Sequence, residues 1–592
     1  MPERRTAALL LLALLLAGGA PAYAAKGAAG GNDDLAARAY LQGRLALSDD
    51  DYAAATRLFG EAMKGGDDDA ALRQSFDAAM LSGDLKAAVR LAGRVELESP
   101  LESSPESSAA DSSAGRSIFA LVKAAEAARK RDWRGYDAAV AEFVSRNVSG
   151  MSEQLLGVSM EAWGKAARGE VEAALAIADP SKSRGVLASY LREQRANILA
   201  LAGRWSEAAD AYAGLVSGEG ASVGRLRLAA AGSVLEASPN DVAAREKAFL
   251  LVGGGAAGDP ALEEARTRLL ADPRIGGRKL AGAAIVASPQ QGIGLLFVRF
   301  AADLVRTRSL GPAIHFGRLA TLVDPSLADG WLITSDVLTR AGKYDAALVA
   351  LDSLPNGASW RGFADDRRAR ILAMAGRVDE ARALLSARAE RPEATAADWE
   401  RLADLERRAE RPAQAIDAYD RALALPADGG GARTAQLHFL RGSVLESAGD
   451  WAEAEPDLRR AVELDGDNPV YLNYLGYSLL DRDGDLAEAR DLIGRAFELA
   501  PESGAIMDSM GWAEHKAGNG ARAVQLLEQA QSAEPSDPTI ADHLGDTLWA
   551  MGRRIEARHA WTAAAALEPE PPLAEAIRRK LEFGLDVAGP GQ

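Results

Sequence analysis

The sequence contains no cysteine. This absence excludes disulfide bonds, thiolate zinc sites, cysteine-ligated iron–sulfur clusters, a thiol nucleophile and lipid attachment through cysteine. Aromatic residues make up only 6% of the 592 residues, and 85 acidic residues outnumber 68 basic ones, which gives a formal net charge of −17. The excess of acid disfavours sequence-independent binding to nucleic acid or anionic lipid, because such binding depends on Lys and Arg.

Long apolar runs are also scarce, and the one that stands out lies near the start. It extends from Ala7 to Ala17, follows Arg4 and Arg5, and precedes the small-x-small sequence of residues 22–24. This arrangement predicts a signal peptide that is cleaved after Ala24. We therefore expect a periplasmic protein, soluble or peripheral to the envelope membrane, with no membrane span after cleavage.

What the sequence does contain is a repeat, clearest in its C-terminal half. A glycine ends one helix, a bulky or variable residue follows, and an alanine then recurs inside the next helix: Ala313, Ala347, Ala381, Ala415, Ala454, Ala489, Ala523 and Ala557. Successive alanines are 34 residues apart, except for one interval of 39 and one of 35. A second small residue precedes most of them by twelve positions, for example Gly511 and Gly545. Small residues at this spacing predict pairs of antiparallel helices that cross closely.

A 34-residue unit of two helices resembles the tetratricopeptide repeat (TPR). The resemblance implies an all-α fold: a right-handed superhelical solenoid of helical hairpins, with degenerate N-terminal repeats and a C-terminal capping helix. We expect these segments in chain order: signal peptide 1–24, degenerate TPR-like repeats 25–97, a Ser-rich loop or hinge 98–117, degenerate helical repeats 118–290, eight TPR repeats in register 291–572, and a capping helix with tail 573–592. The pattern of residues 225–290 predicts helices, but their register within the repeat is not assigned.

The motifs that carry chemistry are weak. Residues 253–258 fit G-x-G-x-x-G, but the preceding segment is helical in pattern, whereas a dinucleotide-binding loop follows a strand. None of the five histidines stands in a metal-binding spacing, and no nucleophile elbow, P-loop or carboxylate pair occurs. We therefore expect no enzyme activity, no cofactor and no metal.

The last three repeats place aromatic and polar side chains where a TPR stack turns its first helices to the concave face. The side chains expected there form a candidate peptide-binding groove: Asn473, Tyr477, Asp508, Trp512, His515, Asp542, Asp546 and Trp549. Rigid aromatic anchors beside polar groups are typical of peptide-binding surfaces. The alternative is that each aromatic side chain packs against the next hairpin.

Residues 473–561 resemble the C-terminal repeats of TPR lipoprotein adaptors that serve carboxyl-terminal processing proteases in the proteobacterial envelope. Those adaptors are lipidated on cysteine, and this chain has none. The resemblance implies a scaffold or adaptor that binds protein or peptide partners, such as an envelope protease or assembly factor. The alternative is a structural spacer or oligomerisation module of a cell-wall or secretion machine.

Overall fold

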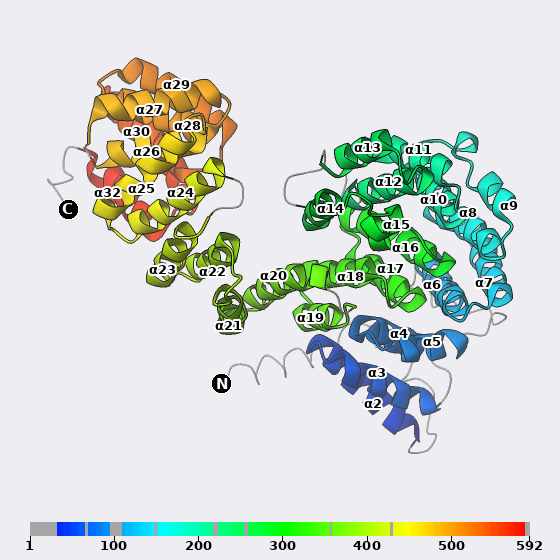
Figure 1. The fold of residues 1–592 in the computed structure, drawn as a ribbon. Coiled ribbons are helices and arrows are strands. Elements are labelled where there is room, and N and C mark those ends of the chain that lie inside the picture. Colours follow the sequence, from blue (N-terminus) through cyan, green and yellow to red (C-terminus); the bar gives the residue numbers. More distant parts are fainter. Residues whose placement is uncertain are drawn as a thin grey trace. The chain divides into compact units, whose positions relative to one another are not determined.

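The computed structural model describes residues 32–65, 69–94, 109–146, 151–216, 223–253, 259–355, 358–426, 430–482 and 484–585. All regular elements in these ranges are helices, so the predicted all-α fold is confirmed. The chain divides into two compact units, residues 1–371 and 372–592, and the boundary falls inside α20 (Figure 1). The predicted signal peptide lies outside the described residues.

The helices follow one another as antiparallel pairs in both units. Those of the first unit are α2 (Asn32–Ser48), α3 (Tyr52–Ala62), α4 (Asp69–Ser82), α5 (Leu85–Arg94), α6 (Ala109–Arg129), α7 (Trp133–Arg146), α8 (Met151–Ala167), α9 (Val171–Ile177), α10 (Gly185–Leu201), α11 (Trp205–Val216), α12 (Val223–Ala237), α13 (Val242–Gly253), α14 (Pro260–Ala271), α15 (Gly277–Ala281), α16 (Pro289–Arg306), α17 (Leu310–Val323), α18 (Ala328–Arg340), α19 (Tyr344–Asp352) and the larger part of α20 (Ala358–Met374). Those of the second unit are α21 (Val378–Ala389), α22 (Ala396–Arg408), α23 (Pro412–Leu423), α24 (Gly431–Ser447), α25 (Trp451–Leu464), α26 (Pro469–Asp481), α27 (Leu486–Leu499), α28 (Gly504–Lys516), α29 (Gly520–Ala533), α30 (Pro538–Ala550), α31 (Arg554–Ala566) and α32 (Pro571–Phe583).

The small residues lie where the two helices of a hairpin cross. The alanine markers Ala313, Ala415 and Ala523 have no exposed surface. At Gly545, a methyl group in place of hydrogen would approach the Trp561 indole to 2.3 Å, closer than any side-chain contact allows. The repeat pattern therefore records the closest approach between helices, as expected for a solenoid in which each hairpin packs on its neighbours.

The turn within a hairpin explains the glycine that ends each first helix. Gly518 has a φ of +80°, a conformation that L side chains rarely adopt. The turn also caps α28, because the amide of Asn519 donates to the carbonyl of Glu514 at 2.8 Å. In a more divergent repeat Glu410 occupies the same position with a φ of +57°. The glycine is thus favoured by backbone conformation, although other residues are tolerated.

In the first unit the chain turns back, and α16 and α17 pack against helices that come much earlier (Figure 1). Helix α17 contacts α4 and α6, while α16 contacts α8 and α10. Arg318 of α17 is fully buried and donates to the carbonyls of Met80 at 2.9 Å and Leu81 at 3.0 Å, at the end of α4. Burial lowers the pKa of Arg318 to about 10, which leaves the guanidinium charged at neutral pH. One continuous core, from Ala39 to Leu327, results.

One detail differs from the sequence-based prediction. Helix α6 begins at Ala109, so residues 109–117 of the predicted Ser-rich loop are helical, and residues 98–108 lie outside the described ranges. Alanines on either side of Ser112 and Ser113 favour a helix. The prediction of a loop gave too much weight to the number of serines. In residues 225–290, α12 and α13 form a hairpin, and the short α15 packs on α12.

Within the described residues, no single helix is both long and apolar enough to cross a bilayer. A bent pair, residues 277–284 with 289–306, meets the length and composition criteria together. Its second helix, α16, is an interior helix of the first unit, where Ile293, Leu296 and Phe297 have no exposed surface. Its apolar character is therefore explained by packing inside the protein.

Candidate peptide-binding groove

The predicted groove residues lie on α26, α28 and α30, the first helices of three successive hairpins of the second unit. Helix α28 contacts both α26 and α30, so the three helices lie side by side. Gly476 and Gly511 let α26 and α28 pack closely on the second helices of their own hairpins, since an added methyl group would meet Ile493 of α27 or Leu527 of α29 at less than 3 Å. The repeat thus places its first helices in a row and their side chains on one surface.

Trp512 is at the centre of an aromatic stack on this surface. The rings of His515 and His543 are both stacked on it, with centroids 4.6 Å and 4.2 Å away and interplanar angles of 7° and 12°. Tyr477 of α26 approaches His543 at a centroid distance of 6.3 Å. We call Tyr477, Trp512, His515 and His543 the Trp512 stack. Tyr477, Trp512 and His515 are half-buried, so part of the stack is available to a partner.

Asp508 holds His543 in the stack. Both residues are buried, and His543 Nδ1 lies 2.9 Å and 3.0 Å from the two carboxylate oxygens of Asp508. Burial opposes protonation of His543, but the carboxylates of Asp508, Asp542 and Asp546 outweigh it and raise the pKa of His543. Burial, with the nearby charges of His543 and Lys516, lowers the pKa of His515. The pKa values of the two histidines are thus shifted in opposite directions, so that His543 is protonated more readily than His515.

The raised pKa of His543 gives a testable pH dependence. A raised pKa in the folded state means that protonated His543 stabilises the fold fully below the unfolded value of about 6.5, and that this contribution is lost as pH rises through the folded value. We expect the difference in Tm between the wild type and His543→Gln to be about 2–4 °C larger near pH 6 than near pH 9. Thermal unfolding at several pH values measures it. A difference that does not change with pH would contradict the ion pair with Asp508.

Three further predicted groove residues, Asp542, Asp546 and Trp549, lie next to the C-terminal helix α32. Lys580 Nζ is 2.7 Å from Asp542 Oδ2 and 2.8 Å from Asp546 Oδ2. Trp549 is buried beside Trp561, at a ring centroid distance of 5.1 Å, and Gly584 lies directly over its ring. Asp542, Asp546 and Trp549 therefore contribute to the contact with the capping helix.

The structure thus divides the predicted groove residues, apart from Asn473, into two clusters. Asp508 and the side chains of the Trp512 stack form one cluster, and Asp542, Asp546 and Trp549 form another beneath α32. Asn473 is half-buried on α26, and its side-chain oxygen has no hydrogen-bond partner among the described residues.

Two residues of these clusters were absent from the predicted strip. His543 lies three positions before Asp546 on α30, and its Nδ1 pairs with Asp508 of α28. Lys580 follows Ile577, the buried residue of α32, by three positions, so the two share one face of the helix. In the basic run Arg578-Arg579-Lys580, Lys580 could therefore have been predicted to face the groove.

The described residues offer little that suggests a reaction centre. They contain no group of three or more His, Asp or Glu side chains placed to hold a metal ion. Most of the Gly-rich motif, residues 254–258, lies outside the described ranges, and the segments on either side are the helices α13 and α14. The strand that a dinucleotide-binding loop requires is therefore not present before it.

Two models of the tetratricopeptide repeat match the chain, one over residues 393–467 and the other over residues 474–538. The matched ranges contain α22 to α25, most of α26, and α27 to α29, with the crossings and turns described above. The chain is a tetratricopeptide repeat protein. TPR hairpins present surfaces to other proteins, and the chain is accordingly a scaffold for protein or peptide partners.

Solved TPR structures are similar to this TPR protein at low sequence identity. The Cut9–Hcn1 hetero-tetramer of the APC/C has 15% identity over 94% of this chain and 97% of that chain, with a TM-score of 0.35. YrrB, described as a TPR protein with an unusual peptide-binding site, has 19% identity over 33% of this chain and 97% of its own, with a TM-score of 0.27. A TPR protein from Parabacteroides merdae has 15% identity over 44% and 98%, with a TM-score of 0.33. No curated protein matches the sequence.

Proposed function

We propose that this TPR protein is a non-enzymatic scaffold or adaptor that binds a peptide segment of its partner on the Trp512 stack. The single observation that carries the proposal is the half-buried Trp512, against which the rings of His515 and His543 are both stacked. An aromatic side chain fixed in this way loses little conformational entropy on binding, which is the property of an anchor residue. The side chain of Lys516, 5.8 Å from the Trp512 ring, adds a polar group at its border.

We also propose that the scaffold acts in the periplasm, in envelope proteolysis or assembly. The signal-peptide pattern of residues 1–24 supports export, and the resemblance of residues 473–561 to envelope TPR adaptors supports the process.

The proposal is tested by pull-down from periplasmic extract with the wild type, Trp512→Ala and Trp399→Ala. Trp399 is a matched control, since it is a half-buried tryptophan on α22, a first helix outside the strip. Trp512→Ala is expected to weaken capture about thirtyfold or more, the usual effect of removing an aromatic anchor, and Trp399→Ala to leave it intact.

Capture of every partner by Trp512→Ala at wild-type strength would contradict the groove. Self-association of the purified chain without a captured partner would instead favour the spacer. Light scattering of the chain alone and with extract distinguishes the two results.

A further inference from the structure

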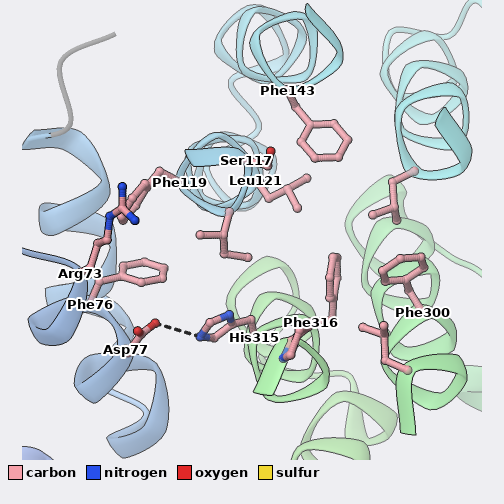
Figure 2. Close-up of a pocket in the computed structure, with 14 residues that line it drawn as sticks. Arg73, Phe76, Asp77, Ser117, Phe119, Leu121, Phe143, Phe300, His315 and Phe316 are labelled. Carbon is pink, nitrogen blue, oxygen red and sulfur yellow. Dashed lines mark ion pairs between the residues drawn. The ribbon is translucent and has the colours of Figure 1, made fainter. Parts of the chain in front are cut away.

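The first unit contains a cavity that the repeat architecture does not require. It lies where α4 and α6 face α16 and α17, the two stretches of chain brought together when the unit turns back (Figure 2). Its volume is about 450 Å³, within the range of small-molecule binding sites. The cavity is open to solvent, so a small molecule can enter it.

The walls of the cavity are mainly aromatic. Five phenylalanines from α4, α6, α7, α16 and α17 line it: Phe76, Phe119, Phe143, Phe300 and Phe316. All five are buried, and two pairs pack edge to face, with centroids 4.7 Å apart for Phe76 and Phe119 and 4.5 Å apart for Phe300 and Phe316. A ligand with an apolar body would recover the dispersion contacts that these walls lack on the cavity side.

One edge of the cavity is polar and reaches solvent. Arg73 and Asp77 of α4 flank Phe76, and His315 of α17 faces them (Figure 2). His315 Nε2 lies 3.3 Å from Asp77 Oδ1, and the Asp77 side chain is 49% exposed. Arg73 is half-buried and forms no ion pair with any residue in the described part of the chain. Among the described residues, the carboxylate at this edge is thus engaged, and the guanidinium has no ionic partner.

We propose that this cavity binds a small amphipathic carboxylate. Its apolar tail lies between the phenylalanine walls, and its carboxylate pairs with Arg73 at the edge. A guanidinium binds carboxylate through two parallel N–H donors, which gives the edge a preference for this head group. A cationic head would face Arg73 as a like charge, and Asp77 could receive it only by giving up His315. The site is separate from the Trp512 stack and does not depend on its function.

The test uses the full chain and three probes of matched tail: decanoate, decanol and decyltrimethylammonium. Titration calorimetry is expected to give measurable binding of decanoate, with decanol about tenfold weaker and the ammonium weaker still. Arg73→Gln is expected to weaken decanoate about tenfold and to leave decanol unchanged. Arg90→Gln, at an exposed arginine of α5 that does not line the cavity, is the matched control and should bind all three probes as the wild type does.

Leu121 lies in the wall on α6, and Leu121→Trp fills the cavity. With a wild-type circular dichroism spectrum, this variant is expected to lose decanoate and decanol together. Absence of decanoate binding to the wild type would overturn the proposal. Equal affinity for decanoate and decanol, or an Arg73→Gln variant that binds decanoate as the wild type does, would also overturn it. The comparison of probes on the unmodified chain keeps the test valid if Leu121→Trp does not fold.

Discussion

Replacement of Trp561 by alanine is expected to cost the second unit about 4 kcal/mol of unfolding free energy. Trp561 of α31 has no exposed surface, and its ring fills the space over Gly545 that no side chain on α30 could occupy. Its indole N–H donates to Asp546 Oδ1 at 2.9 Å, and Trp549 packs beside it. The substitution therefore leaves both a large cavity and a buried carboxylate with one donor fewer.

The two parts of this loss are separated by Trp561→Phe. Phenylalanine keeps most of the volume and removes only the N–H donor, while Lys580 still pairs with Asp546, so a loss of about 1–2 kcal/mol is expected. Hydrogen exchange on α30, α31 and α32 measures both variants in the full chain. A loss below about 1 kcal/mol for Trp561→Ala would show that the hairpin crossing at Gly545 is not the stabilising contact described here.

Replacement of Arg318 by methionine is expected to destabilise the first unit by about 3 kcal/mol. Methionine retains much of the buried volume, but the carbonyls of Met80 and Leu81 lose their donor at the end of α4. Buried carbonyl groups without a partner are costly, and the positive charge that favours a helix C-terminus is lost as well. Because α4 and α17 are far apart in sequence, the loss affects the contact that closes the first unit.

Arg306→Met is the matched control for Arg318→Met. Arg306 is exposed and pairs with Asp303 within one helix, so its removal is expected to change stability by less than about 0.5 kcal/mol. Hydrogen exchange should show α4 and α17 opening together in Arg318→Met. Faster exchange in α17 alone would mean that the two helices are stabilised independently.

The hairpins could be predicted from the sequence because their determinants are local. Ala523 and Gly511 record a crossing between two helices that are adjacent in the chain, and Gly518 records the turn that joins them. Ile577 of the predicted capping helix is likewise buried. Such contacts recur in every repeat, so one pattern predicts all of them.

The contacts that could not be predicted join residues far apart in the chain. The 34-residue period does not show that the hairpin of α16 and α17, which contains Arg318, packs against α4. Trp549 has the same repeat position as His515, yet it is buried, because a capping helix rather than another hairpin follows it. The predicted groove residues fall into two clusters because a capping helix, and not another hairpin, follows the last repeat.

The central claim, that a partner segment lies on the Trp512 stack, is tested most directly by photo-crosslinking in cells. A photoreactive phenylalanine derivative replaces Tyr477, at the half-buried edge of the stack, or Glu528, an exposed residue of α29. We predict adducts with a discrete partner from position 477, their loss in the Trp512→Ala background, and none from position 528. Equal adducts from both positions, or none from position 477, would contradict the account.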